Sequence, residues 1–269
     1  METSLYFKTA LILSIQLGIV FLGCFYFIRT ARKHCLEDRP FFGLRFEAKK
    51  NSRGELDLVP IVPEPVITAS PVVRERLANA SPSVKAMIRD NPASLPQQSG
   101  PMSQLILIWM FSLFGMTFLA PINTTVGITL MTISSIAFAP LLGLIMLEAD
   151  ENDGLRTILV TVFITVAAAL VGMYSGIDFS PMREFLFYGL CGLILFGLIR
   201  LLFGMNGALV RFKAILGAIL FSLFLIYDFN RLKQLNDLGT NDWATALQIA
   251  ISLYLDIINL LLELLAASE

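Results

Sequence analysis

The chain has 269 residues, 56% of them hydrophobic and only 15% charged, with a net charge of -1. A soluble domain carries about 25% charged residues, so this composition predicts a polytopic membrane protein. The balanced charge gives no basic field for nucleic acid. One histidine, His34, and three cysteines without a C-x-x-C pair argue against zinc, thiol-redox and Ser-His-Asp chemistry. We therefore expect neither an enzyme nor a cofactor.

The first apolar run covers residues 9–28 and ends in the basic stretch RTARK, residues 29–33. It is longer than the core of a signal peptide and lacks a small-residue cleavage site. The basic stretch is typical of a stop-transfer signal. We therefore predict that residues 1–29 form a retained first transmembrane helix.

Residues 30–102 form a polar, proline-rich segment that we expect to be a partly disordered loop. Its first part is rich in Lys and Arg, and residues 59–65 read as extended polyproline-like chain. A short amphipathic helix is expected either at residues 70–79 or at residues 83–90, the latter after Ser81-Pro82. Two interpretations stay open: a solvated loop whose basic residues meet lipid headgroups, or a docking surface for a membrane-protein partner.

Residues 103–269 are predicted to form a six-helix membrane domain. Apolar runs of spanning length are separated by short polar or glycine-containing turns. Pro140 lies inside one of them and is expected to kink it, and Asn241 or Asp242 is expected to cap the last one. The predicted spans are residues 104–120, 126–147, 155–174, 184–203, 208–229 and 243–265. The chain is thus predicted to be an all-α membrane protein with seven transmembrane helices.

Two carboxylates lie where a membrane helix should not have one. Asp228 stands at the predicted end of the sixth span, and Asp256 stands near the middle of the seventh. An ionisable group at membrane depth costs roughly 3 kcal/mol or more, and it usually faces a bundle interior and marks a pathway. The alternatives are structural: Asp228 would be a helix-end group paired with Arg231, and Asp256 would be hydrogen-bonded to a neighbouring helix.

Asn259 and Glu263 follow Asp256 at i+3 and i+7, so the three side chains share one helix face. This polar stripe predicts that the seventh helix faces the bundle interior. Glu263 stands near the end of the span, and its alternative position is the membrane interface.

Two carboxylates brought together at low dielectric cannot both ionise readily, so such a pair can share one proton. Loss of that proton makes the carboxylates repel each other or attract a hard cation through their oxygens. The chemistry allows a proton-gated cation path, a proton-coupled exchanger or a structural pair.

Two motifs carry a family resemblance. FSLFLIYDFNRL, residues 221–232, resembles the sixth-helix signature of the Bax inhibitor-1 (TMBIM or LFG) family, and SLYLDIINL, residues 252–260, resembles its seventh-helix signature. The resemblance implies seven helices with the last one at the centre. It also implies a pH-sensitive calcium leak or Ca²⁺/H⁺ exchange, with Asp228 and Asp256 as the paired carboxylates that meet the transported Ca²⁺.

The chain departs from the family pattern in three ways. Residues 30–102 stand where the family has a short turn, and the second span lacks the arginine that latches an aspartate in some bacterial members. The lysines and arginines beside the spans favour an outside N-terminus, whereas the resemblance implies an inside one. An integral multi-pass protein of a bacterial inner membrane or an organelle membrane is expected.

A second function therefore stays open beside transport. The chain would then be a non-transporting regulator or accessory subunit, for example of a membrane protease, binding through residues 30–102. An intramembrane aspartic protease is disfavoured, because the motifs do not combine Tyr-Asp with Gly-x-Gly-Asp.

Overall fold

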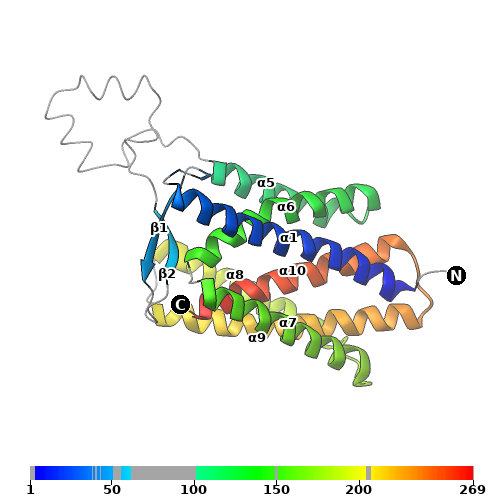
Figure 1. The fold of residues 1–269 in the computed structure, drawn as a ribbon. Coiled ribbons are helices and arrows are strands. Elements are labelled where there is room, and N and C mark those ends of the chain that lie inside the picture. The colour runs from blue at the N-terminus through cyan, green and yellow to red at the C-terminus, as the bar shows by residue number, and fades with distance from the viewer. Residues whose placement is uncertain are drawn as a thin grey trace, which may run out of the picture.

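The structure is a computed structural model that describes residues 4–37, 39, 41–42, 44–50, 56–61, 101–148, 151–203 and 207–268. Its described part contains seven helices long and apolar enough to cross a membrane, which confirms the predicted all-α membrane fold. They lie side by side along a common axis (Figure 1). The helices are α1 (Leu5–Leu36), α5 (Pro101–Leu119), α6 (Thr124–Glu148), α7 (Glu151–Tyr174), α8 (Met182–Phe203), α9 (Gly207–Asp237) and α10 (Trp243–Ser268).

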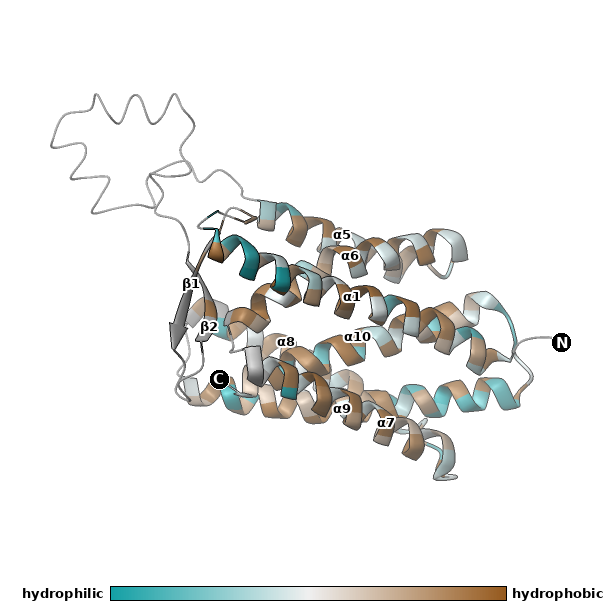
Figure 2. Cartoon of the chain, in the orientation of Figure 1, coloured by the Kyte–Doolittle hydropathy of each residue, from teal (hydrophilic) through white to brown (hydrophobic). Residues whose placement is uncertain are grey.

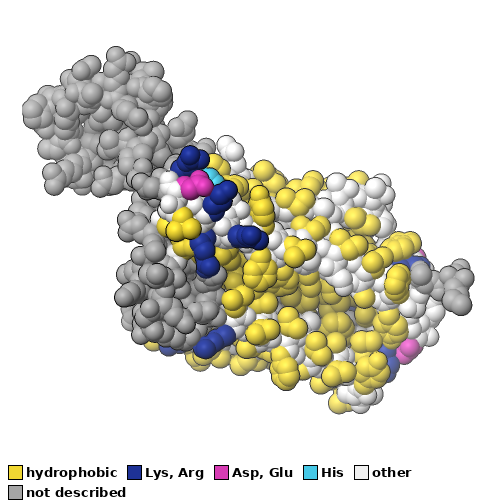
Figure 3. Space-filling model, in the orientation of Figure 1, with side chains coloured by type: hydrophobic (Ala, Val, Ile, Leu, Met, Phe, Trp, Pro, Cys, Tyr) yellow, Lys and Arg dark blue, Asp and Glu magenta, His cyan; other side chains and the backbone are white. Residues whose placement is uncertain are grey.

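The last helix, α10, lies at the centre of the bundle, as predicted (Figure 1). It packs against α1, α6, α7 and α9. Of its most apolar 18-residue stretch, 61% is buried inside the protein, the same share as in α6. By contrast, only 11% and 6% of the corresponding stretches of α5 and α8 are buried. Their leucine and phenylalanine side chains are left for lipid, and Figure 3 shows a broad apolar band between charged ends.

Three helices extend four residues or more beyond their predicted bounds. Helix α1 continues past residue 29 to Leu36, α7 begins at Glu151, four residues before the predicted span, and α9 runs on to Asp237. The hydrophilic residues of α9 gather in these last turns (Figure 2). No proline or glycine lies between Asp228 and Gly239, and Gly239 has a positive φ of 79°. The prediction that Asp228 stands at a helix end was therefore wrong, because α9 continues for two further turns after this residue.

A β-hairpin, which the sequence analysis did not predict, lies within the segment 30–102. Strands β1 (Arg45–Lys50) and β2 (Leu56–Ile61) pair antiparallel, with Arg45 opposite Ile61. Phe46 and Leu58 are buried, and the strands pack on α1 and α6. The hairpin thus fixes part of a segment expected to be disordered. The helix predicted at residues 70–79 or 83–90 lies outside the described residues.

Buried polar side chains tie α1, α6 and α10 together. Gln16 of α1 donates to Thr132 of α6 over 3.0 Å and accepts from Ser135 over 2.9 Å. The hydroxyls of Ser135 and Tyr254 of α10 lie 3.3 Å apart. Because no water competes inside a membrane bundle, such bonds fix the relative positions of the three helices.

Candidate functional site

Asp228 and Asp256 face each other across two consecutive antiparallel helices. Asp228 lies on α9 and Asp256 on α10, and the two side chains are hydrogen-bonded to each other. The residues are only 5% and 8% exposed. Asp256 is about 20 Å from either end of α10 at 1.5 Å per residue, which places the pair deep in the bundle. The structure therefore brings together the two carboxylates singled out from the sequence.

A hydrogen bond between two carboxyl groups requires a proton on at least one of them, because ionised carboxylates only accept. The second oxygen of Asp256, Oδ2, is buried and has no hydrogen-bond partner within the described part of the chain. Arg231, one turn along α9, is exposed and interacts electrostatically with Asp228. The geometry thus suits a pair that holds one proton and keeps one oxygen free.

The position of Asp228 is set by close contact between α9 and α7. Gly172 of α7 packs against the backbone of α9, and a Cβ on it would lie 2.5 Å from the carbonyl oxygen of Ile226. Asn230, two residues after Asp228, donates to the carbonyls of Gly172 and Ile177, each over 3.0 Å. It also accepts from the backbone N–H of Phe179 over 3.1 Å. The sequence analysis quoted Asn230 within its motif and gave it no role.

Glu263 does not join the aspartate pair. It lies two turns beyond Asp256 on α10 and forms an ion pair with Lys213 near the start of α9. Gly217 leaves room for it, since a Cβ there would lie 2.6 Å from the Glu263 carboxyl carbon. Asn259 lies between the two acids on the same face and is half-buried.

Lys213 was not among the site residues expected from the sequence. A signal was present, however, because Lys213 opens the sixth span and Glu263 closes the seventh. In consecutive antiparallel helices these two positions meet.

The acids near the pair are too few for a resident metal centre. Within the described ranges, no group of three or more His, Cys, Asp or Glu side chains could hold a metal ion. Ca²⁺ takes six to eight oxygen ligands, and two carboxylates supply at most four.

Comparison with known proteins places the chain in a family. Residues 77–267, more than half of the chain, match the family model described as "Inhibitor of apoptosis-promoting Bax1". The chain belongs to the Bax inhibitor-1 family. Together with the seven apolar helices, this makes it an integral multi-pass membrane protein.

Several curated relatives match part of the chain. Protein LIFEGUARD 3 of Arabidopsis thaliana is 32% identical over 143 residues, covering 52% of this chain and 56% of that protein. Protein lifeguard 4 of Mus musculus is 38% identical over 112 residues, covering 40% and 44%. Bax inhibitor 1 of Saccharomyces cerevisiae is 30% identical over 148 residues, covering 51% and 48%. The chain spans about half the length of these relatives.

Proposed function

We propose that the protein is a pH-sensitive calcium leak channel or Ca²⁺/H⁺ exchanger gated by the Asp228–Asp256 pair. The observation that supports this is the contact of two buried carboxyl groups on adjacent helices deep in the bundle. Membrane helices rarely carry acids at this depth, and those that do usually mark an ion or proton pathway.

The proton decides the state of the pair. With one proton shared, the hydrogen bond holds α9 and α10 together at this level and neutralises half of the site. When the proton leaves, two negative charges face each other. Two unit charges about 4 Å apart, at an effective dielectric constant of about 20, repel by about 4 kcal/mol. Their repulsion separates the helices, or the two negative charges attract Ca²⁺, the transported substrate, to the carboxylate oxygens. Calcium flux should therefore rise as pH rises through the titration of the pair.

Flux from proteoliposomes tests the proposal. Purified protein is reconstituted around a calcium indicator, and flux is measured over a range of pH for wild type, Asp228→Asn and Asp256→Asn. The amide keeps the size and hydrogen bond of a protonated carboxyl, so both variants should show low flux without pH dependence. Asp237→Asn is the matched control, because Asp237 is an exposed acid on the same helix. If both buried variants keep the flux and the pH dependence of the wild type, the proposal is wrong.

A proton gradient separates the leak from the exchanger. Vesicles with equal calcium on both sides are given a pH step. An exchanger will use the pH step to build up a calcium gradient across the membrane, whereas a leak will not. Either result is compatible with the proton-gated pair, and it decides which of the two activities the pair serves.

The β-hairpin supports the second candidate function, a non-transporting regulator or accessory subunit. Because strands Arg45–Lys50 and Leu56–Ile61 pack on α1 and α6, they give the segment 30–102 a fixed attachment at one membrane end. A partner captured only when this segment is present, together with absent calcium flux, would favour this function over transport.

A further inference from the structure

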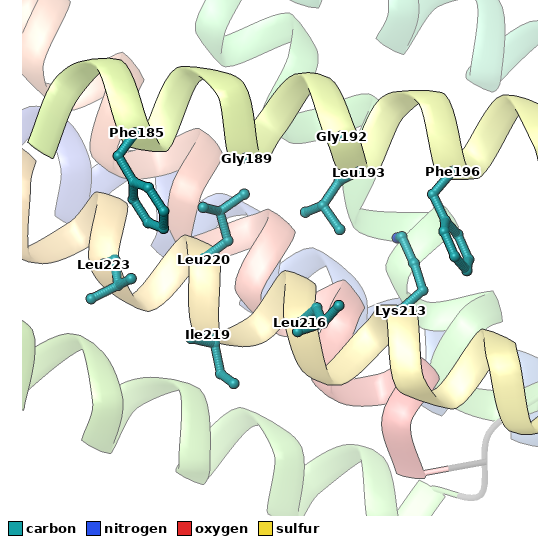
Figure 4. A pocket seen from close by; sticks show the side chains of 10 residues that line it. All are labelled: Phe185, Gly189, Gly192, Leu193, Phe196, Lys213, Leu216, Ile219, Leu220 and Leu223. Carbon is teal, nitrogen blue, oxygen red and sulfur yellow. The ribbon is translucent and has the colours of Figure 1, made fainter.

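An apolar groove runs between α8 and α9 on the outside of the bundle (Figure 4). It has a volume of about 320 Å³, and its lining includes Phe185, Leu193 and Phe196 from α8 and Leu216 from α9. Helix α8 is the least buried of the seven described spans, so the groove faces lipid. A groove of this kind in a membrane is filled by lipid unless another helix covers it.

Two glycines on α8 shape the groove. A Cβ on Gly189 would lie 2.7 Å from Leu220, so the helices are in close contact at that turn. A Cβ on Gly192 would meet nothing within 4 Å, so the space opens one turn later. From Phe185 to Phe196 the lining covers about 16 Å of helix, which matches one leaflet of a hydrocarbon core about 30 Å thick. The length therefore suits one acyl chain.

Among the described residues, Lys213 is the one charged residue in the groove lining, and it stands near the Phe196 end (Figure 4). Arg200, in the last turn of α8, and Arg211, in the first turns of α9, are exposed at the same membrane end. Glu263 engages Lys213 from α10. An ammonium has three N–H donors, however, so the pair leaves capacity for a further acceptor. The first turn of α9 contains no acidic residue.

We propose that this groove binds an anionic phospholipid. One acyl chain lies between α8 and α9, and the phosphate lies at the end marked by Arg200, Arg211 and Lys213. A neutral zwitterionic lipid offers the same chain but no net charge for these cations, so the preference should follow the headgroup. Since Lys213 also contacts Glu263, the headgroup would lie at the junction of α8, α9 and α10.

Photolabelling of the full-length protein tests the site. Nanodiscs are prepared with phosphatidylglycerol or phosphatidylcholine carrying a photoreactive group in the acyl chain, and labelled peptides are mapped. Phosphatidylglycerol should label α8 and α9 more strongly than phosphatidylcholine. Gly192→Phe fills the open turn and should abolish this labelling. Gly197→Phe is the matched control, because Gly197 is on α8, has nothing within 4 Å of its added Cβ, and does not line the groove.

The headgroup contacts are tested separately. Arg211→Gln removes an exposed cation, and Lys213→Gln with Glu263→Gln removes the ion pair without leaving a lone charge. Each should lower the affinity for phosphatidylglycerol about fivefold, and neither should change phosphatidylcholine labelling. Equal labelling by the two lipids would overturn the proposal, as would unchanged labelling in Gly192→Phe. Crosslinking of a second copy or of another protein in place of lipid would do the same.

Discussion

Lys213 of α9 and Glu263 of α10 form an ion pair on the same helix hairpin that carries Asp228 and Asp256. The side chains of Lys213 and Glu263 are 23% and 13% exposed, so both charges are largely removed from solvent. The two acidic residues of the polar stripe on α10 thus have different partners. Asp256 meets an acid, whereas Glu263 meets a base.

Breaking the ion pair should cost more than replacing it. Glu263→Met leaves Lys213 half-buried without its partner and should lower the free energy of unfolding by about 2 kcal/mol. Lys213→Met with Glu263→Met removes both charges and should cost less than about 1 kcal/mol. Thermal unfolding of the three proteins in one detergent measures the difference. A double variant at least as unstable as Glu263→Met would contradict this account.

Gly172 should tolerate no side chain. Gly172→Ala places a Cβ 2.5 Å from the Ile226 carbonyl oxygen, so α9 must move away from α7. We expect a loss of about 1–3 kcal/mol, as for other overpacked sites. Gly197→Ala is the control: its Cβ meets nothing within 4 Å, and alanine favours a helix over glycine by up to about 1 kcal/mol. Equal thermal stability of the two variants would show that the close approach is unimportant.

The sequence was sufficient to predict the number of helices, and the family resemblance implied that the last one is central (Figure 1). The sequence also singled out Asp228 and Asp256, whose role stays a prediction. Apolar runs of spanning length can form little else in a membrane, and Asp256 stands out against its apolar neighbours. The ends of the helices were harder, because the polar residues after Asp228 resemble a loop although they continue α9.

Other features depended on pairing between distant residues. Lys213 and Glu263 are 50 positions apart in the sequence, and Asn230 and Gly172 are 58 positions apart. Neither contact has a local pattern. The hairpin was missed because lysines and a proline are unusual in strands.

Tyr254 should matter for stability and not for the proton response. Its hydroxyl contacts Ser135 of α6, while Asp256, two residues on, meets Asp228 of α9. Tyr254→Phe should therefore cost about 1 kcal/mol of stability and leave the pH profile of calcium flux in place. A shifted profile in this variant would mean that the Tyr254 hydroxyl takes part in the titration.

Asp242 should make the protein sensitive to acid at one helix end. It caps α10 by accepting from the backbone N–H and the hydroxyl of Thr245, each over 2.8 Å. These bonds lower the pKa of Asp242. Its stabilisation is therefore complete above the unfolded pKa of about 3.9 and is lost as pH falls through the lower folded pKa.

Two substitutions separate the cap from the charge of Asp242. Asp242→Ala should cost about 1 kcal/mol at neutral pH. Asp242→Asn should keep most of the cap and remove its acid sensitivity. Thermal unfolding near pH 7 and near pH 3 checks both, and an equal acid response in the Asn variant would exclude the cap as its source.

The central claim is that Asp228 and Asp256 share a proton whose loss opens the path. Infrared spectroscopy of the reconstituted protein follows that proton directly, through the carbonyl stretch of a buried protonated carboxyl. The account predicts that this band disappears over the same pH range in which calcium flux rises, and that it is missing or shifted in Asp228→Asn and Asp256→Asn while Asp237→Asn keeps it. A band that persists through the rise in flux, or that both buried variants leave unchanged, would contradict the account.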